Sequence, residues 1–169
     1  ESLGVPEVIM IPDQFLAANI ARQTGVKVIT HPGACEVHER FTPHDIRQVR
    51  ADYPDGVTVL AHPECPPEVV DEADFSGSTA QMIKFVAEKR PKRVALVTEC
   101  SMSDNVAQEY PDVEFVRPCN LCPHMKRNTL AKIRHALETM TNEVTIDPDV
   151  ADRARAAVER MLEVGAPPK

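Results

Sequence analysis

The sequence predicts a layered α/β fold with small parallel sheets, ending in two helices. Three observations indicate this fold. Short apolar runs alternate with segments whose apolar residues recur at helical spacing, Gly and Pro residues separate the two kinds of segment, and only helical patterns follow Cys122. Strands that alternate with helices pair in parallel and are joined by right-handed crossovers. With 169 residues, of which 43% are hydrophobic, the chain can bury a core.

The first elements form a strand, a helix and a second strand. The apolar run over residues 5–12 ends at Pro12 and predicts a strand buried on both faces. Asp13 is the expected N-cap of a helix that stops near Gly25. Residues 26–30 then form the next buried strand.

The alternation continues as far as residue 116. We expect helices from Thr42, from residues 76–79 and over residues 103–109, and strands over residues 57–61, 93–98 and 113–116. The prolines at 63, 66 and 67 predict an irregular loop. The closing helices span residues 129–141 and 148–164, with a short extended link at residues 144–146.

Composition excludes several classes of protein. With 19 Lys and Arg against 26 Asp and Glu, the net charge is −7, so a nucleic-acid partner is not expected. No apolar stretch approaches the ~18 residues that span a bilayer, and residues 1–7 lack the features of a signal peptide. We expect a soluble, cytoplasmic protein, in which the five cysteines serve metal or redox chemistry and not a disulfide framework.

Cysteine, histidine and glutamate residues cluster just after predicted strands. Since ligands bind at the carboxyl ends of parallel strands, these side chains are expected at one side of the protein. They are Cys35, His38, His62, Glu64, Cys65, Cys119 and Cys122.

The C-x-x-C pair of Cys119 and Cys122 has several interpretations. Two thiolates at this spacing can share a metal or form a disulfide, and the proline that follows is typical of iron–sulfur ligand runs. A zinc site would need Cys35 and His38 as its second pair. A zinc-binding structural module and a Cys119/Cys122 thiol–disulfide redox protein therefore both remain open, as do small buried residues in turns.

The segment from His62 to Pro67 is a candidate catalytic turn. Its prolines fix the backbone, and a rigid turn holds Glu64 in place as general acid–base catalysis requires. The alternative is a solvated loop with incidental charges. Cys65 is expected to be a packing residue.

The start of the helix near Ser76 is a candidate anion site. Its hydroxyl groups and unpaired N–H groups can cradle an anion, although helix capping alone also explains them. The remaining cysteine and histidines lack a partner at a suggestive spacing and are expected to be structural or surface residues: Cys100, His31, His44 and His135.

Taken together, these motifs resemble those of the C-terminal half of the quinolinate synthase family. The motifs are Pro12-Asp13-Gln14, the run from Pro32 to Phe41, the run from His62 to Pro66, Gly77-Ser78-Thr79 and the run from Cys122 to Arg127. Their order and separations match the family over essentially the whole chain.

The resemblance implies an activity and an architecture. Members of this family condense iminoaspartate with dihydroxyacetone phosphate to give quinolinate, phosphate and water, in de novo NAD biosynthesis. They consist of three similar three-layer α/β/α domains about a pseudo-threefold axis, and each domain gives one cysteine to a 4Fe-4S cluster. Residues 1–34 would end the second domain, residues 35–122 would form the third, and residues 123–169 would pack on the first.

The resemblance also implies roles for individual residues. Cys35 and Cys122 match two cluster ligands, and the third ligand would precede residue 1. Three thiolates leave one iron open to act as a Lewis acid. Glu64 matches the acid–base residue, and His38 and His62 match histidines that line the pocket and hold carboxylate or phosphate.

Further implications concern phosphate, partners and cysteine chemistry. Ser78 and Thr79 match the hydroxyls of the phosphate site. L-Aspartate oxidase would supply iminoaspartate. Cys119 matches no ligand, but it could form a reversible disulfide with Cys122 when that residue does not hold iron. Because the first domain is absent, this polypeptide alone is expected to be inactive.

Overall fold

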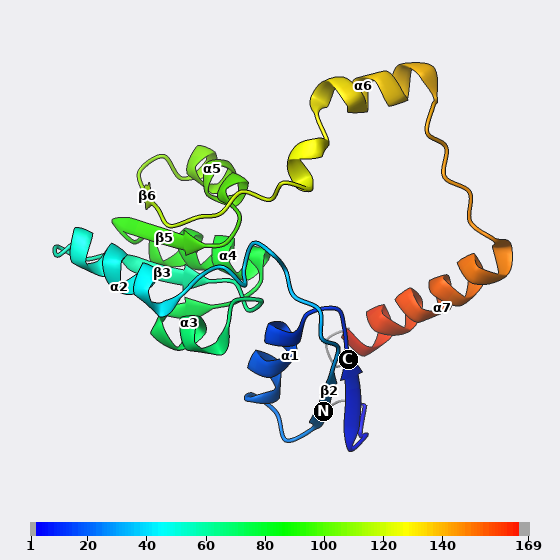
Figure 1. The fold of residues 1–169 in the computed structure, drawn as a ribbon, viewed down its shortest axis with the longest axis horizontal. Helices are drawn as coiled ribbons and strands as arrows, with labels where there is room; N and C mark the ends of the chain where they lie inside the picture. The colour runs from blue at the N-terminus through cyan, green and yellow to red at the C-terminus, as the bar shows by residue number, and fades with distance from the viewer. Residues whose placement is uncertain (1–2, 166–169) are drawn as a thin grey trace. The chain divides into compact units, whose positions relative to one another are not determined.

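The computed structural model describes residues 3–165, and the chain divides into two compact units. The larger unit contains residues 6–123, and the smaller contains residues 124–165 together with the start of the chain. The strands are β1 (Glu7–Met10), β2 (Lys27–Thr30), β3 (Thr58–Ala61), β4 (Phe75–Ser76), β5 (Arg93–Val97) and β6 (Glu114–Val116). The helices are α1 (Gln14–Ala21), α2 (Pro43–Asp52), α3 (Pro67–Glu72), α4 (Thr79–Lys89), α5 (Cys100–Glu109), the 3₁₀ turn η1 (Met125–Arg127), α6 (Leu130–Thr139) and α7 (Pro148–Gly165) (Figure 1).

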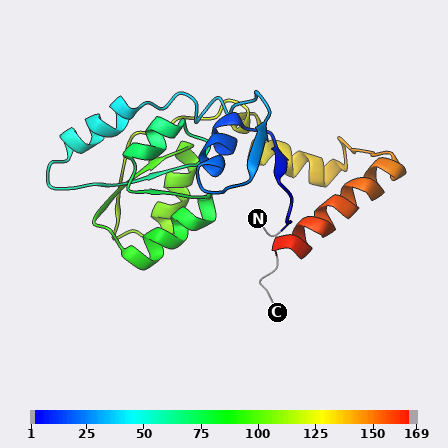
Figure 2. The same ribbon diagram turned by 90° about the horizontal axis from the view of Figure 1, so that it is seen from below.

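The centre of the larger unit is a four-stranded parallel sheet in the order β4-β3-β5-β6. One face packs against α2 and α3, with Ile46 and Val69 in the cluster. The other face packs against α4 and α5, with Met82 and Val106. Figure 2 shows the strands between these helices. The predicted α/β layers and parallel sheet are therefore confirmed.

The sheet explains why β3 and β5 are apolar after their first residues, Thr58 and Arg93. Both strands lie in the interior of the sheet, and helices cover both of its faces, so successive side chains enter opposite cores. Leu60 and Leu96 face one cluster, while Val59 and Val97 face the other. Polar residues that follow these strands are consequently held at the edge of a rigid core.

A separate two-stranded parallel sheet joins β1 to β2 in the same unit, and α1 packs against β2. The expectation that residues 5–12 form a strand buried on both faces is wrong, as is the expectation that residues 26–30 form a buried strand. Ile9 is 75% exposed and Ile29 is 39% exposed in the structure. The reason is that, within residues 6–123, α1 packs against this small sheet and no second layer of helices covers it as in the larger sheet.

Two short elements follow the irregular segment at residues 62–66 that the prolines predicted. Pro67 occupies the first turn of α3, where a missing N–H leaves no donor unsatisfied. β4 then pairs with β3 through Ala61 and Ser76. Gly77 follows at a close approach, since a Cβ atom there would lie 2.8 Å from the ring of Phe75. The start of α4 is thus held beside the end of β3.

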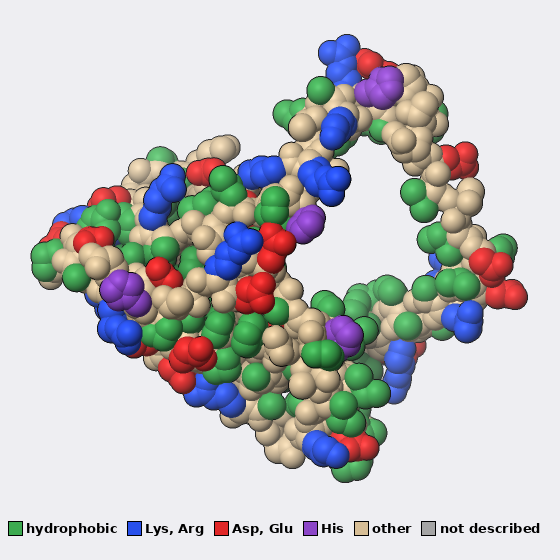
Figure 3. Space-filling view, in the orientation of Figure 1, with side chains coloured by type: hydrophobic (Ala, Val, Ile, Leu, Met, Phe, Trp, Pro, Cys, Tyr) green, Lys and Arg blue, Asp and Glu red, His purple; other side chains and the backbone are tan. Residues whose placement is uncertain are grey.

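In the smaller unit, α6 and α7 are amphipathic helices whose apolar side chains are exposed. Thr129 caps α6 by accepting a hydrogen bond from the backbone N–H of Lys132, and Asp147 caps α7. Exposed apolar residues include Leu130, Leu137, Met140, Met161 and Leu162. Figure 3 shows hydrophobic side chains on the surface of this unit. Within residues 3–165, none of the helices combines the length and apolar character that crossing a membrane requires.

Candidate functional site

The candidate site is built on the turn that follows β3. His62 donates its backbone N–H to the carbonyl of Val97 on the neighbouring strand, and Cys65 donates its own back to the carbonyl of His62. The turn is therefore closed on itself and joined to β5. These hydrogen bonds hold the backbone on both sides of Glu64, and the catalytic role expected for Glu64 stays a prediction.

Asn19 fixes the same turn from α1. This buried side chain donates through Nδ2 to the carbonyl oxygens of Pro63 and Cys65, each at 2.9 Å. The two carbonyls flank Glu64 on either side. Because Asn19 lies in the core, the turn cannot move without exposing or breaking these hydrogen bonds.

A second loop, after β2, brings Cys35 and His38 to the site. His38 and Glu39 both donate their backbone N–H groups to the carbonyl of Cys35, which coils the chain into a compact turn. The ring of His38 is buried, and its Nε2 lies 2.9 Å from Oγ1 of Thr98. Thr98 follows β5, so the ring is held at the end of a central strand.

Glu64 and His38 form a close polar contact between the two loops. Oε2 of Glu64 lies 2.9 Å from Nδ1 of His38 and 3.7 Å from Nδ1 of His62. The contact with His38 lowers the pKa of Glu64 below its usual value, against the opposing effect of burial. Glu64 is therefore a carboxylate at neutral pH.

His62 is held as a neutral ring. Burial is the main cause that lowers the pKa of His62, and the charge of His38 lowers it further, while Glu64 opposes both. The backbone N–H of Glu64 approaches Nδ1 of His62 at 3.3 Å, so Nδ1 accepts. The proton of the neutral ring then lies on Nε2.

The site contains a group of three side chains that are close enough to bind one metal ion: Cys35, His38 and Glu64. Their Sγ, nitrogen and carboxylate oxygen atoms all lie within 4.8 Å of one another. Thiolate, imidazole and carboxylate are all common ligands of transition metals. Cys65, in contrast, is fully buried, and burial raises the pKa of its thiol to about 12. The prediction that Cys65 is a packing residue is confirmed.

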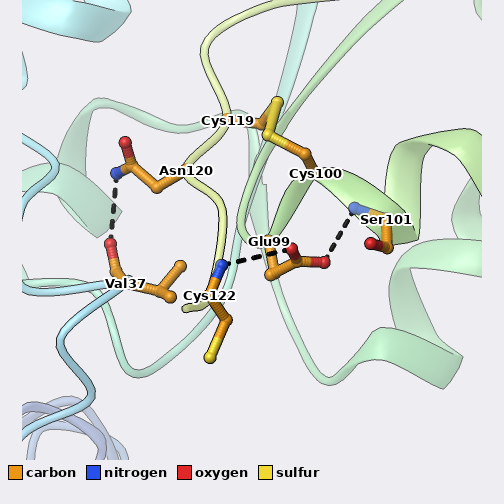
Figure 4. Close-up of a disulfide and its surroundings, with 7 residues drawn as sticks. All are labelled: Val37, Glu99, Cys100, Ser101, Cys119, Asn120 and Cys122. Carbon is orange, nitrogen blue, oxygen red and sulfur yellow. Dashed lines mark hydrogen bonds between the residues drawn. A yellow bond between two sulfur atoms is a disulfide. The ribbon is translucent and has the colours of Figure 1, made fainter. Parts of the chain in front are cut away.

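Cys122 lies on the segment after β6, which is attached to α5 by a disulfide. The bond joins Cys100 to Cys119, and Cys122 retains its thiol (Figure 4). The expectation that Cys100 has no partner is wrong, as is the expectation that the cysteines form no disulfide. A Cys119/Cys122 disulfide is also excluded in this state, because Cys119 is bonded to Cys100. An isolated parallel β-bridge between Glu99 and Asn120 lies beside this bond.

The same disulfide rules out the four-ligand zinc site considered above. A zinc module built on Cys35, His38, Cys119 and Cys122 loses Cys119, whose sulfur is bonded to Cys100 and cannot be a thiolate ligand. The structure supplies Glu64 in its place beside Cys35 and His38.

Ser78 and Thr79 stand at the start of α4 and are exposed. The side chain of Ser78 accepts from the backbone N–H of Gln81, and Gln81 accepts from the N–H of Ser78 in return. Ser78 thus caps α4, as the capping interpretation expects. Since β4 pairs with β3, this helix start and the Glu64 turn follow adjacent parallel strands.

Sequence reasoning missed three of the buried polar residues that support the site, namely Asn19, Thr98 and Glu99. Among residues 3–165, the buried polar side chains are those of Asp13, Asn19, His38, Thr98 and Glu99, and each contacts a loop of the site. Thr98 and Glu99 directly follow a buried strand, the same signal that identified His62 and Glu64. His31, His44 and His135 are exposed, as predicted.

The fold and the site define an α/β protein that gathers Cys, His and Glu side chains at the carboxyl edge of a parallel sheet. Residues 1–163 match the family model described as quinolinate synthetase A protein, and the chain belongs to this family of enzymes.

Similar proteins carry the same name. The chain is 68% identical to quinolinate synthase 2 of Mesorhizobium japonicum, 65% identical to quinolinate synthase of Agrobacterium fabrum and 63% identical to that of Xylella fastidiosa. Each comparison covers 97% of this chain and 50%, 47% and 48% of the respective relative. The chain spans about half the length of the curated relatives it matches.

Proposed function

We propose that this chain is the C-terminal part of a quinolinate synthase, which condenses iminoaspartate with dihydroxyacetone phosphate to form quinolinate, phosphate and water. The observation that carries the proposal is the 2.9 Å contact between Glu64 and His38, beside the thiol of Cys35, in a member of this family. A fixed carboxylate next to two histidines is suited to repeated proton transfers.

The cysteines fit the ligand set of a 4Fe-4S cluster. Cys65 is inaccessible and Cys100 and Cys119 are bonded to each other, so the thiols of Cys35 and Cys122 are the ones that remain. Both are partly buried and pack against the same hydrophobic cluster. A third cysteine, outside this chain, would complete the set. When bound, a cluster with three thiolate ligands supplies a Lewis-acidic iron for the dehydration chemistry.

Glu64 serves as the base and then as the acid. Its low pKa makes it a carboxylate at the outset, ready to take a proton from the carbon or nitrogen that reacts. His38 stabilises the carboxylate from one side and is itself fixed by Thr98. Once protonated, Glu64 returns the proton to a leaving hydroxyl group.

His62 binds substrate as a hydrogen-bond donor. Since Nδ1 accepts a hydrogen bond from the backbone N–H of Glu64, Nε2 carries the proton. The Nε2–H group donates a hydrogen bond to a carboxylate or phosphate oxygen of the substrate. A neutral ring does this without bringing a positive charge against the neighbouring ring of His38. Ser78 and Thr79 bind the phosphate of dihydroxyacetone phosphate at the N-terminus of α4, where the helix dipole favours an anion.

The remaining assignments concern the intact enzyme. Residues 1–34 end its second domain, residues 35–122 form the third, and residues 123–169 pack on the first. The enzyme works in the cytoplasm with iminoaspartate from L-aspartate oxidase. This chain alone is inactive, because the third cysteine and the first domain's share of the substrate site lie outside it.

The experiment uses the full-length protein that contains this chain, reconstituted anaerobically with iron and sulfide. Quinolinate formation from iminoaspartate and dihydroxyacetone phosphate is measured for the wild type, Glu64→Gln and Glu68→Gln. Glu68 is an exposed carboxylate in the first turn of α3 and is the matched control. The proposal expects activity in the wild type and in the Glu68 variant, and a fall of about 10²–10⁴-fold for the Glu64 variant. A reconstituted wild type that makes no quinolinate overturns it.

A further inference from the structure

Asp13 connects the start of α1 to Cys35. One carboxylate oxygen accepts a hydrogen bond from the backbone N–H of Leu16 at 2.8 Å, which caps the helix. The other oxygen accepts from the backbone N–H of Cys35, also at 2.8 Å. The residue is 3% exposed, so both contacts are sheltered from water.

Glu99 makes the same pair of contacts at the start of α5. One oxygen accepts from the backbone N–H of Ser101 at 2.7 Å and caps that helix. The other accepts from the backbone N–H of Cys122 at 3.3 Å. Figure 4 shows Glu99 between Ser101 and Cys122. Glu99 is 8% exposed.

The two carboxylates occupy equivalent places in the fold. Each follows a parallel strand, β1 or β5, and is the N-cap of the helix that comes next. Each divides its two oxygens between the helix and the backbone of a cysteine. This arrangement needs a carboxylate, because two N–H groups face the side chain, whereas an amide offers one acceptor and one donor.

Burying a carboxylate costs free energy because its charge loses water, and here hydrogen bonds and a helix N-terminus offset that cost. Charge-assisted hydrogen bonds from two N–H groups, together with the dipole of a helix N-terminus, stabilise the negative charge. Helix capping alone would use one oxygen, as Ser78 does for α4. The second oxygen of each carboxylate is therefore the feature that capping leaves unexplained.

We infer that Asp13 and Glu99 are positioning residues that hold the backbone of Cys35 and Cys122 so that both thiols are presented to one metal cofactor. This inference rests on the proposed function. The backbone N–H groups of Cys35 and Cys122 then donate hydrogen bonds to the two carboxylates, and not to sulfur atoms of the cofactor. Hydrogen bonds to sulfur and nearby charge both set the potential of an iron–sulfur cluster. The two carboxylates thus lower the potential as well as fixing the ligands.

The test compares Asp13→Asn and Glu99→Gln with Asp45→Asn in the full-length protein. Asp45 is the matched control, because its carboxylate accepts the backbone N–H of Thr42 at the start of α2. Each protein is reconstituted with iron and sulfide and then challenged with a chelator. The iron retained, the reduction potential of the cluster and the backbone hydrogen exchange of the metal-free protein are measured.

We expect Asp13→Asn and Glu99→Gln each to lower iron affinity by about 10-fold or more, as for residues that orient metal ligands. The potential of any remaining cluster should rise, and the amide of the affected cysteine should exchange faster. The control should match the wild type in iron affinity, in potential and in the exchange of the Cys35 and Cys122 amides. Unchanged iron affinity, potential and exchange in both variants would overturn the inference.

Two further outcomes keep the test decisive. If neither variant folds, slow exchange at Cys35 and Cys122 in the metal-free wild type supports the inference, and exchange as fast as in an unfolded peptide overturns it. If the wild type binds no cluster at all, the proposed function fails. The two failures are therefore distinguishable.

Discussion

The rings of His38 and His62 stack, with their centroids 4.3 Å apart and their planes 14° from parallel. Oε2 of Glu64 approaches Nδ1 of both rings. Two stacked imidazoles in a partly buried site repel each other when both are charged, and this repulsion contributes to the lowered pKa of His62. The site is thus arranged so that no more than one charged ring accompanies the carboxylate.

This arrangement predicts how stability depends on pH. The pKa of His62 in the folded protein lies below its ordinary value of 6.5, so the unfolded chain takes up the proton first. The stabilisation is complete above that value and is lost as the pH falls from 6.5 through the lowered pKa. The unfolding free energy of His62→Gln should therefore fall less over this pH range than that of the wild type. Urea denaturation at a series of pH values measures both. An unchanged pH profile would contradict the assignment.

Glu64 also stabilises the folded protein less as the pH falls, but over a lower pH range than His62. Its pKa is lowered from 4.5, so its contribution to stability is complete above that value and is lost as the pH falls through the lowered pKa. Glu64→Gln should flatten the stability profile below pH 4.5, whereas Glu68→Gln, at an exposed position, should leave it unchanged. Equal profiles for the Glu64 variant and the wild type would be the contrary result.

Cysteine labelling should separate the thiols into two classes. Burial raises the pKa of Cys65 to about 12, and no part of its side chain is accessible. Thiolate is the reactive form, so Cys65 should resist alkylation in the native metal-free protein, while the partly exposed Cys35 and Cys122 react. Mass spectrometry of peptides from the labelled protein gives the rate at which each cysteine is alkylated. Labelling of Cys65 as fast as Cys35 in the folded protein would contradict this burial.

The disulfide should contribute measurably to stability. Cys100 and Cys119 are separated by 19 positions, and closing a loop of this length stabilises by about 3 kcal/mol in the chain-entropy description. Cys100→Ser should lower the unfolding free energy by an amount of this order under non-reducing conditions. Reductant should lower the stability of the wild type but not that of the variant. A wild type insensitive to reductant would show that the bond does not constrain the chain.

Asn19 should be needed for the Glu64 turn. Asn19→Ala leaves the partly buried carbonyl of Pro63 and the buried carbonyl of Cys65 without their donor, and an unpaired buried group costs about 1–3 kcal/mol. We expect a loss of about 2 kcal/mol or more in unfolding free energy, together with a lower kcat. Asn105→Ala on the exposed face of α5 should change stability by less than about 0.5 kcal/mol. Equal effects of the two substitutions would contradict the role of Asn19.

Local sequence signals predicted most of the elements and part of the site. Asp13 was expected as an N-cap and is one, and the strand before His62 was expected from its unbroken apolar run. The prolines predicted the turn that carries Glu64, although hydrogen bonds to Asn19 and Val97, which are distant in sequence, also hold this turn. Cys35 and His38 also lie within one turn, so their proximity is local.

Long-range pairings could not be predicted in this way. Cys100 meets Cys119 because Glu99 pairs with Asn120, and that register depends on the packing of β5 beside β6. Asn19 reaches a turn 44 residues away, and no local pattern marks a mid-helix asparagine as buried. The exposure of β1 was missed for the same reason, since an apolar run does not show how many layers cover it.

The proposed function depends above all on Cys35 and Cys122 holding one iron–sulfur cluster in the intact protein. The iron and sulfide content of the full-length protein after anaerobic reconstitution decides this, measured for Cys35→Ser, Cys122→Ser and the control Cys119→Ser. We expect a 4Fe-4S cluster in the wild type and in the control, and its loss in each of the other two variants. A cluster that survives loss of both Cys35 and Cys122, or a wild type that takes up zinc in its place, would refute the assignment.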